Sequence, residues 1–312
     1  MTTVTIFGIT LTFNKIAFTI PIGAGWDVYW YGIIIGLGCL LALLFGMKNA
    51  ERFNLDRDRM LDVVLVTIPV AILCARAYYC LFDSPTGIKI SNLKEFFGFD
   101  GSGFAGLAIY GGIIGAFICG AIMCKLRKVN ILDMFDIAAL GFLIGQGIGR
   151  WGNFINQEAF GLPTGSDWFG MKSFETGNVN VHPCFLYESI WCIAGFFILN
   201  HFSKKRKFSG ETALMYGVWY GFGRFFIESI RTDQLTIGKI PVSMLVSAII
   251  FIACLVLLVY FSRRKTVEAA TAPYESLFRE QMDDYQETEE EETSEITEET
   301  TESVVETAEE EE

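Results

Sequence analysis

Charged and amide side chains that interrupt an apolar run are the first candidates for chemistry in this chain. The stretch GQGIGRWGNFINQEAFG, residues 145–161, closes a long apolar run and contains Arg150, Asn153 and Glu158. Its glycines also spell G-x-G-x-x-G, the fingerprint of dinucleotide-binding proteins. That fingerprint has physical meaning only between a strand and a helix of a βαβ unit. The preceding residues are typical of one long apolar helix, so the sequence disfavours a dinucleotide site.

A second polar stripe lies in ALMYGVWYGFGRFFIESIR, residues 213–231. Arg224, Glu228 and Arg231 follow one another at spacings of four and three residues, so a helix places them on one face. Small residues occupy the same face in the preceding turns. Two interpretations stay open. Glu228 pairs with both arginines in a buried network that joins helices, or the arginines bind an anionic ligand.

The composition indicates an apolar, mildly basic body followed by an acidic tail. The chain is 52% hydrophobic, with a mean hydropathy of +0.39. Nineteen acidic residues and one arginine fall within residues 268–312, so the net charge of −12 leaves +6 for residues 1–267. We expect a membrane domain over residues 1–265. The remainder, 266–312, has little aliphatic content and repels itself, which predicts a disordered cytoplasmic tail.

Apolar windows long enough to cross a bilayer recur along the body of the chain. They cover residues 28–47, 60–82, 104–124, 132–150, 183–202, 212–230 and 241–261. The sequence therefore predicts an all-α, polytopic integral membrane protein with seven transmembrane helices. The first, third and fifth connecting segments, and the stretch after the last span, are the segments rich in Lys and Arg. Cytoplasmic segments carry such an excess, so we expect the N-terminus outside and the C-terminus inside.

Polar residues within or at the ends of these spans gather at one depth. An ionised side chain at the bilayer centre costs ~2.5–3.5 kcal/mol or more, which makes such residues candidates for function. With the orientation above, they lie toward the outward ends of their spans. They are Tyr31, Arg76, Tyr110, Arg150, Asn153, Asn156, Glu158, Tyr187, Glu188, Arg224 and Glu228. Arginine binds phosphate through a bidentate fork, and phospholipid head groups supply phosphate at that depth. The sequence predicts a phospholipid pocket toward the outer leaflet.

Metal, cofactor and nucleic-acid chemistry have little support in the sequence. None of the eight cysteines forms a C-x-x-C pair, most lie in apolar runs, and the chain has two histidines. A zinc site or a disulfide framework is therefore disfavoured. We expect no cofactor, no metal and no nucleic-acid partner.

The motif GRWGNFINQEAFG, residues 149–161, closely resembles the signature of the prolipoprotein diacylglyceryl transferase family, roughly G-R-x-G-N-F-x-N-x-E-x-x-G. The resemblance covers about residues 28–261. It continues through WYG at 30–32, YGGIIG at 110–115, HPCFLYE at 182–188 and GRFFIESIR at 223–231. It implies transfer of a diacylglyceryl group from phosphatidylglycerol to the lipobox cysteine of a preprolipoprotein, forming a thioether and releasing glycerol phosphate. It also implies a multi-pass protein of the bacterial cytoplasmic membrane, with its active site toward the outer leaflet.

The resemblance further implies roles for individual residues. Arg150 and Arg224 match the family's phosphate-binding pair, and we expect Glu228 to orient Arg224 one turn away. Four more residues match family positions that matter for activity or lipid binding: Tyr31, Asn153, Glu158 and Gly161.

One position departs from the family pattern. Some members carry a histidine, proposed as the base, where this chain has Tyr110. A tyrosine side chain, with a reference pKa of ~10, is a poor base. The identity of the base stays open, and we expect a neutral hydroxyl donor at this position. An alternative function from another class is a phospholipid-binding transporter or flippase that uses the same pocket.

Overall fold

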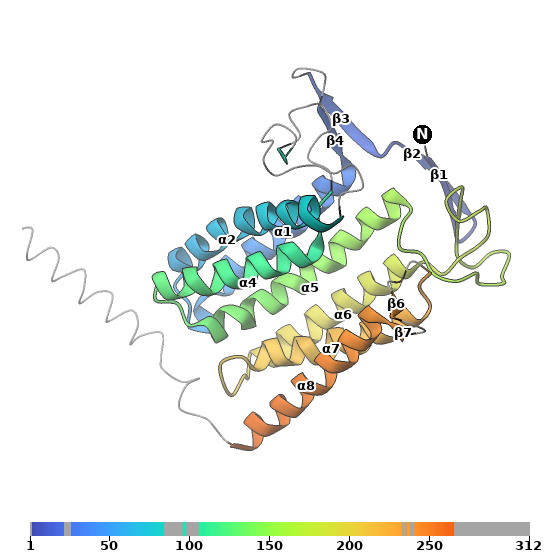
Figure 1. Ribbon diagram of the computed structural model, residues 1–312. Coiled ribbons are helices and arrows are strands. Elements are labelled where there is room, and N and C mark those ends of the chain that lie inside the picture. Colours follow the sequence, from blue (N-terminus) through green and yellow to red (C-terminus); the bar gives the residue numbers. More distant parts are fainter. Residues whose placement is uncertain are drawn as a thin grey trace, which may run out of the picture. The chain divides into compact units, whose positions relative to one another are not determined.

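The computed structural model describes residues 2–21, 26–83, 96–97, 106–232, 234, 236–237 and 240–264. Within these ranges the long helices are α1 (Trp30–Asn49), α2 (Arg57–Tyr78), α4 (Ile109–Leu126), α5 (Ile131–Asn156), α6 (Cys184–Ser203), α7 (Glu211–Ser229) and α8 (Val242–Arg264) (Figure 1). A short 3-10 turn, η1 (Glu51–Phe53), follows α1, and a π turn, η2 (Tyr79–Asp83), extends α2. The expected acidic tail, residues 266–312, lies outside the described residues.

Six of these helices are long and apolar enough to cross a membrane: Trp30–Asn49, Arg57–Phe82, Ile109–Leu126, Ile131–Asn156, Cys184–Ser203 and Val242–Arg263. Each overlaps one of the spans predicted from the sequence, so the protein is a polytopic helical membrane protein. The remaining predicted span, 212–230, forms α7. This helix is similar in length but is not one of the six, and its C-terminal half carries Arg224 and Glu228.

The helices pack mainly in pairs, with α2 against α4, α1 against α5 and α7 against α8, while α6 lies against α5 and α7 (Figure 1). Glycines permit the closest approaches. A methyl group added at Gly111 would lie 2.4 Å from a side-chain carbon of α2, and one added at Gly217 would lie 2.3 Å from Cys254 Sγ on α8. These two helices carry glycines at a four-residue spacing, which favours close packing in lipid. The same spacing at Gly32 and Gly36 has no such role, because added methyl groups there meet no atom within 4 Å.

The apolar core has two parts. One cluster lies between η1, α2, α5 and α6. It is formed by Ala50, Phe53, Leu55, Met60, Ile137, Leu140, Leu143, Cys192 and Leu199. The other lies beneath the strands at the opposite end, and it consists of Val4, Phe154, Met171, Val181 and Phe185.

A carboxylate of α5 joins that helix to the start of α7. Asp136 is fully buried and accepts hydrogen bonds from the backbone N–H groups of Gly210 and Ala213, both at 2.8 Å. The oxygen that accepts from Gly210, Oδ2, also lies 2.9 Å from Arg206 Nη1, and the same nitrogen lies 2.6 Å from Asp133 Oδ1. Asp136 therefore satisfies N–H groups that the first turn of α7 leaves without helical partners.

The contact between Asp136 and the start of α7 also sets how far along the bundle two arginines lie. Arg150 follows Asp136 by the same number of residues as Arg224 follows Gly210. At 1.5 Å per residue, each arginine stands about 21 Å along its helix from this contact. Arg150 and Arg224 are thereby brought to one level at the other end of the bundle.

Several short strands lie outside the helices and were not predicted from the sequence. β1 (Thr2–Ile6) and β2 (Ile9–Phe13) form a hairpin, and β5 (Met171–Ser173) pairs with the other side of β1, giving the order β2-β1-β5. β3 (Ile16–Ile20) pairs with β4 (Trp26–Tyr29), and β6 (Thr236–Ile237) pairs with β7 (Ile240–Pro241). These strands lie outside the long apolar windows on which the span prediction depended. They place a small sheet beyond the end of α5 (Figure 1).

Candidate functional site

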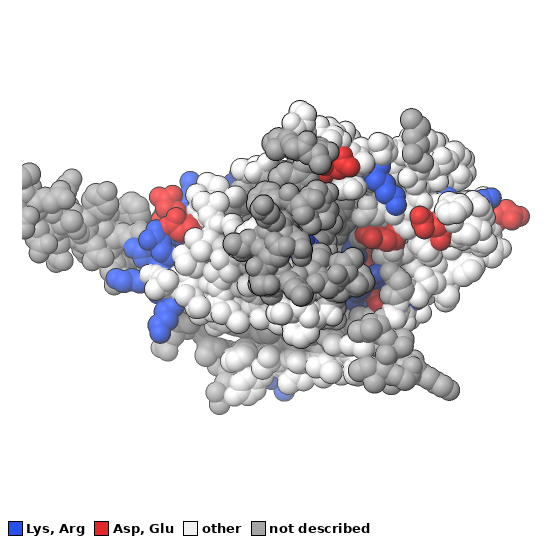
Figure 2. Space-filling model, turned by 45° about the horizontal axis from the view of Figure 1, so that its top comes forward, with Lys and Arg blue, Asp and Glu red and all other residues white. Residues whose placement is uncertain are grey.

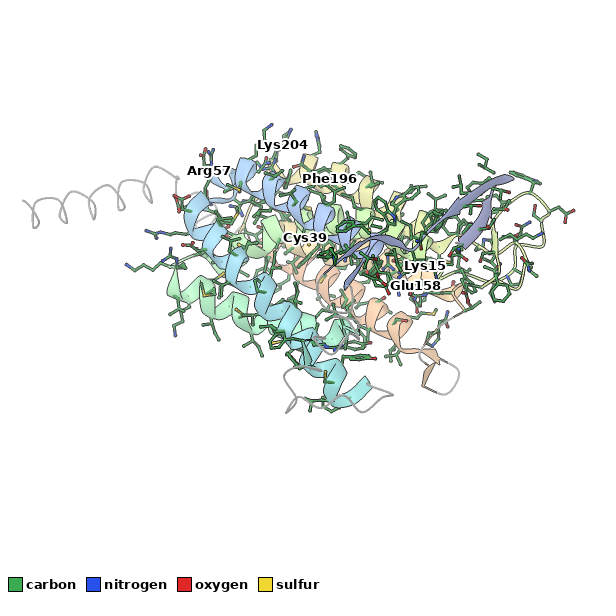
Figure 3. All side chains as sticks on the ribbon, turned by 90° about the horizontal axis from the view of Figure 1, so that it is seen from above. Lys15, Cys39, Arg57, Glu158, Phe196 and Lys204 are labelled. Carbon is green, nitrogen blue, oxygen red and sulfur yellow. The ribbon has the colours of Figure 1, made fainter. Side chains whose placement is uncertain are left out.

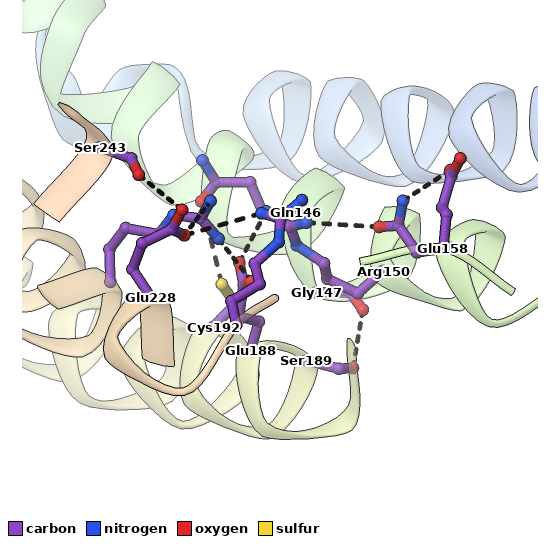
Figure 4. A network of polar contacts seen from close by, with 12 residues as sticks. Gln146, Gly147, Arg150, Glu158, Glu188, Ser189, Cys192, Glu228 and Ser243 are labelled. Carbon is purple, nitrogen blue, oxygen red and sulfur yellow. Dashed lines mark hydrogen bonds and ion pairs between the residues drawn. The ribbon is translucent and has the colours of Figure 1, made fainter. Parts of the chain in front are cut away.

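The centre of the site is a buried carboxylate that contacts two arginines from different helices (Figure 4). The side chain of Glu188 on α6 is 4% exposed. Its Oε2 lies 2.6 Å from Arg150 Nη2 on α5, and its Oε1 lies 2.5 Å from Arg224 Nη1 on α7. Pro183 precedes the first residue of α6, so Glu188 falls in the second turn of the helix. Glu188 therefore bridges the two arginines that the sequence analysis assigned to phosphate.

A second carboxylate extends the network along α7. Glu228 Oε2 lies 2.6 Å from Arg224 Nη2 and 3.7 Å from Arg231 Nη1. Ser243 Oγ, at the start of α8, donates a hydrogen bond of 2.5 Å to Glu228 Oε1. The pairing of Glu228 with both arginines is thus present. It holds Arg224 between two carboxylates, one from α6 and one from its own helix.

The other arm of the network leads from Arg150 to an exposed carboxylate. Arg150 Nη1 donates to Asn153 Oδ1 at 3.3 Å, and Asn153 Nδ2 donates to Glu158 Oε1 at 2.9 Å. Asn156 Nδ2 donates to the same oxygen at 3.3 Å. Gln157 adopts the left-handed conformation, with φ 58°, and thereby ends α5. The two amides hold the Glu158 carboxylate at this end of the helix.

Lys15 ties the N-terminal strands to this loop. Its Nζ donates a hydrogen bond of 2.9 Å to the carbonyl oxygen of Asn156, and Figure 3 shows it beside Glu158. Trp30, the first residue of α1, donates its N–H to the carbonyl of Lys15 at 3.1 Å. The segment between β2 and α1 is therefore bonded to the loop that follows α5.

Two glycines, Gly152 and Gly161, allow close contacts near the network. The ring of Tyr31 lies against Gly152 of α5, where an added methyl would be 2.2 Å from Tyr31 Cδ2. Gly161 donates its N–H to the carbonyl of His182 at 2.9 Å and forms an isolated β-bridge with Arg231. Atoms of neighbouring segments lie within 3 Å of a methyl built on Gly161. A larger residue at Gly152 would disturb the contact with the Tyr31 ring, and a larger residue at Gly161 would disturb the contacts with neighbouring segments.

Two residues of the predicted pocket stand apart from the network. Arg76 is fully buried and donates to the carbonyls of Phe96 (2.9 Å) and Gly106 (3.1 Å), so it holds the backbone between α2 and α4. Tyr110 lies in the first turn of α4 with 54% of its surface exposed, and it makes no hydrogen bond within the described part of the chain. A role for Tyr110 in the site stays a prediction.

Other polar groups of the site were not assigned a role from the sequence. Glu188 was recognised as an intramembrane acid in a family motif, but its bridging of two arginines depends on the packing of three helices. Lys15 and Ser243 gave no signal, because single Lys and Ser residues near span ends are common. One helical turn before Arg150 in α5, Gln146 Nε2 donates a hydrogen bond of 2.8 Å to the hydroxyl of Tyr216. The polar character of the site therefore continues into the membrane.

The network gathers several charged side chains in a small volume. Within the described residues, its buried or half-buried members are three arginines and two glutamates: Arg150, Arg224, Arg231, Glu188 and Glu228. Buried charges are costly unless they are balanced. The forks of arginine side chains suit the oxygens of a phosphodiester.

Gly152 and Gly149 offer a matched test of the packing at the site. We expect Gly152→Ala to lower the thermal unfolding midpoint in detergent, because the new methyl would displace Tyr31 or α5. Overpacking of this kind costs about 1–3 kcal/mol. A methyl at Gly149, in the same helix, meets no atom within 4 Å, so Gly149→Ala should keep or raise the midpoint. Equal loss in both variants would contradict the contact between Tyr31 and α5.

The chain is similar to a known protein family and to individual members of it. The model of the family "Prolipoprotein diacylglyceryl transferase" matches residues 15–260. A phosphatidylglycerol–prolipoprotein diacylglyceryl transferase of Clostridioides difficile (strain 630) is 39% identical over 251 residues, covering 80% of this chain and 96% of the relative. The protein of the same name from Finegoldia magna is 41% identical over 252 residues, covering 80% and 97%. One from Bacillus cytotoxicus is 39% identical over 254 residues, covering 78% and 90%. Because the family model matches residues 15–260 and these relatives are 39–41% identical over most of both chains, the chain belongs to the prolipoprotein diacylglyceryl transferase family.

Proposed function

We propose that this protein transfers the diacylglyceryl group of phosphatidylglycerol to the lipobox cysteine of a prolipoprotein, the first step of bacterial lipoprotein maturation. The observation that carries the proposal is the bridge by which Glu188 holds Arg150 and Arg224 together. The names of the relatives supply the two substrates. The network supplies a place for the phosphate of the lipid.

The reaction makes three demands on the protein. The sulfur of the cysteine thiolate attacks the glycerol carbon that bears the phosphate, so a C–S bond forms while the C–O bond breaks. The electron pair of that C–O bond leaves on the phosphate oxygen, where negative charge grows and must be stabilised. The thiol must also lose its proton, and lipid and peptide must be aligned. A thiol of pKa ~8.5 is a few per cent ionised at neutral pH, so modest help suffices for the second demand.

Arg150 and Arg224 meet the first demand. A guanidinium has five N–H groups. Arg224 uses two nitrogens on Glu188 and Glu228, and Arg150 uses two on Glu188 and Asn153. N–H groups remain on both arginines for the oxygens of a phosphate. The carboxylates fix the guanidinium planes, so the donors are oriented before the lipid arrives.

The remaining site residues surround the phosphate position. We assign Asn153 and Glu158 to the catalytic group, since they continue the chain of contacts from Arg150 to an exposed carboxylate. Tyr31 and Gly161, together with Glu228, complete the side that binds phosphatidylglycerol.

We place this site toward the outer leaflet of the bacterial cytoplasmic membrane, with α7 as the sixth of seven spans. Figure 3 shows Arg57 and Lys204 at one end of the helices and Lys15 and Glu158 toward the other. On the face drawn in Figure 2, basic side chains cluster at the left-hand end. The positive-inside rule assigns the basic end to the cytoplasm, which supports an outward site.

Cysteine labelling tests this orientation. In intact cells, a membrane-impermeant maleimide should label Lys172→Cys in β5, because this exposed residue lies on the proposed outer side. A cysteine at the equally exposed Lys205, in the variant Lys205→Cys, should react only after the cells are permeabilised. Labelling of wild-type protein measures the reaction of the native cysteines and is subtracted. The reverse pattern would contradict both the orientation and the outward site.

Substitution of Arg224 separates phosphate binding from structural support. Arg224→Lys keeps the charge but loses the planar fork, so we expect transferase activity to fall about tenfold or more. The thermal midpoint in detergent should change little, since an ammonium still reaches one carboxylate. A stability loss that parallels the activity loss would favour a purely structural ion-pair network.

Tyr110 is tested through the pH profile. If its hydroxyl acts as a neutral donor, Tyr110→Phe lowers activity while the rise of activity with pH keeps its shape, following ionisation of the substrate thiol. If an ionised tyrosine acts as the base, the substitution removes a titration step. Tyr110→His is the control and should stay active, because some members of the family carry histidine there. A folded but inactive Tyr110→His enzyme would remove position 110 from the site.

The proposed function itself is tested with purified protein, phosphatidylglycerol and a lipobox peptide. Mass spectrometry should detect the diacylglyceryl peptide and glycerol phosphate in equal amounts. A peptide with serine in place of the lipobox cysteine should give neither product. Binding of the lipid without thioether product would contradict the transferase proposal.

A further inference from the structure

β2 is an edge strand that lacks the features with which proteins protect such edges. Within the described residues it pairs with β1 alone, in a regular register from Thr2↔Phe13 to Ile6↔Ile9. Its sequence, ITLTF, contains no lysine, proline or bulge. Ile9 is 64% exposed and Leu11 41%. Unprotected edges of this kind are templates for a further strand.

The register shows which backbone groups of β2 face outward. The two-residue turn at Phe7 and Gly8, with φ of 47° and 81°, fits a type I′ hairpin. In such a hairpin the pair that flanks the turn exchanges both hydrogen bonds, and alternate residues point away. The outward N–H and C=O groups of β2 are therefore those of Thr10 and Thr12.

Two further contacts agree with this assignment. Phe7, on the far side of the hairpin, donates its N–H to Gly170 at 3.1 Å, in the direction of β5, as the alternation requires. The hydroxyls of Thr10 and Thr12 lie 3.0 and 3.2 Å from those of their cross-strand partners. Such short side-chain distances are typical of pairs that exchange no backbone bonds.

β2 leads directly to the site. The ring of Phe13, its last residue, lies 5.7 Å from that of Phe154, which follows Asn153 in α5. Lys15, two residues further on, is bonded to the loop that holds Glu158. From there back to Thr10 is about 17 Å at 3.4 Å per residue. A strand placed along β2 would end beside the site.

We propose that the segment of the prolipoprotein that follows the lipobox cysteine adds to this edge as an antiparallel strand. The inference rests on the proposed function. The apolar part of a secretory signal precedes its processing site and stays in the bilayer, so the chain that leaves the membrane is the part after the cysteine. An antiparallel strand begins at the Phe13 end, near the site, and runs toward the turn at Phe7.

This mode of binding explains the chemistry of the edge. Backbone groups of Thr10 and Thr12 bind the main chain of the substrate and are indifferent to its sequence, while Ile9 and Leu11 contact alternate side chains. The substrate cysteine is thereby held in position next to the phosphate-binding arginines, which meets the alignment demand of the reaction.

Proline substitutions test the proposal. Thr10→Pro and Thr12→Pro remove outward N–H groups without removing a bond to β1, and edge strands tolerate proline there. Thr10→Val and Thr12→Val are the controls, because they change the side chain and keep the N–H. Two acceptor peptides are used: one ends at the lipobox cysteine as an amide, and the other continues for about six residues.

In the wild type, the KM for the longer peptide should be about tenfold lower than that for the shorter one, as two main-chain hydrogen bonds would give. The double proline variant should lose this preference, with unchanged kcat, unchanged KM for phosphatidylglycerol and an unchanged thermal midpoint. The valine variants should behave as wild type. A preference retained by a folded double proline variant overturns the inference.

A second measurement on wild-type protein covers the case in which the proline variants unfold. N-methylation of alternate residues after the cysteine should raise the KM in one register and leave it unchanged in the other, because only one set of N–H groups faces β2. Equal effects in both registers overturn the inference. Absence of thioether product from both peptides with wild-type protein overturns the proposed function, and the inference with it.

Discussion

The contact of Glu188 with two arginines is the interaction on which the site depends. Arg150 and Arg224 come from different helices and would repel each other in an apolar environment. A carboxylate between them removes that repulsion and uses one oxygen for each guanidinium. Breaking a buried charge pair costs more than its formation stabilises, so the three helices are bound to one arrangement at this end. Glu228 repeats the principle on α7, where it orients the other side of Arg224.

Such a contact forms only if helix packing brings its members to the same height. The carboxylate of Asp136 fixes the start of α7 against α5 at the end of the bundle away from the site. Equal lengths of helix then carry Arg150 and Arg224 to the level of Glu188. The glycines of α4 and α7 allow neighbouring helices to approach closely. The chemistry of the site thus depends on capping and packing along the whole bundle.

The sequence predicts the parts of this arrangement that depend on local pattern. Apolar windows locate the long helices because burial in lipid is a property of each window, and the polar interruptions identify Arg150, Arg224 and Glu228. What a pattern cannot supply is partnership between helices. Arg76 has the same pattern as Arg150, yet it bonds to nearby backbone carbonyls. The strands β1 and β2 were missed since they are short and outside the apolar windows, and the contact of Lys15 with Asn156 depends on their packing.

The balance of charge in the network bears on how it could act in the proposed reaction. Three arginines without carboxylates would bind any phosphate tightly and would hold the product as firmly as the transition state. Glu188 and Glu228 offset part of that positive charge. As the C–O bond breaks, the phosphate gains charge while the oriented N–H groups stay fixed, so the interaction strengthens toward the transition state. Glu188 and Glu228 therefore do more than position the arginines, because they also limit how strongly the site binds its substrate before the reaction.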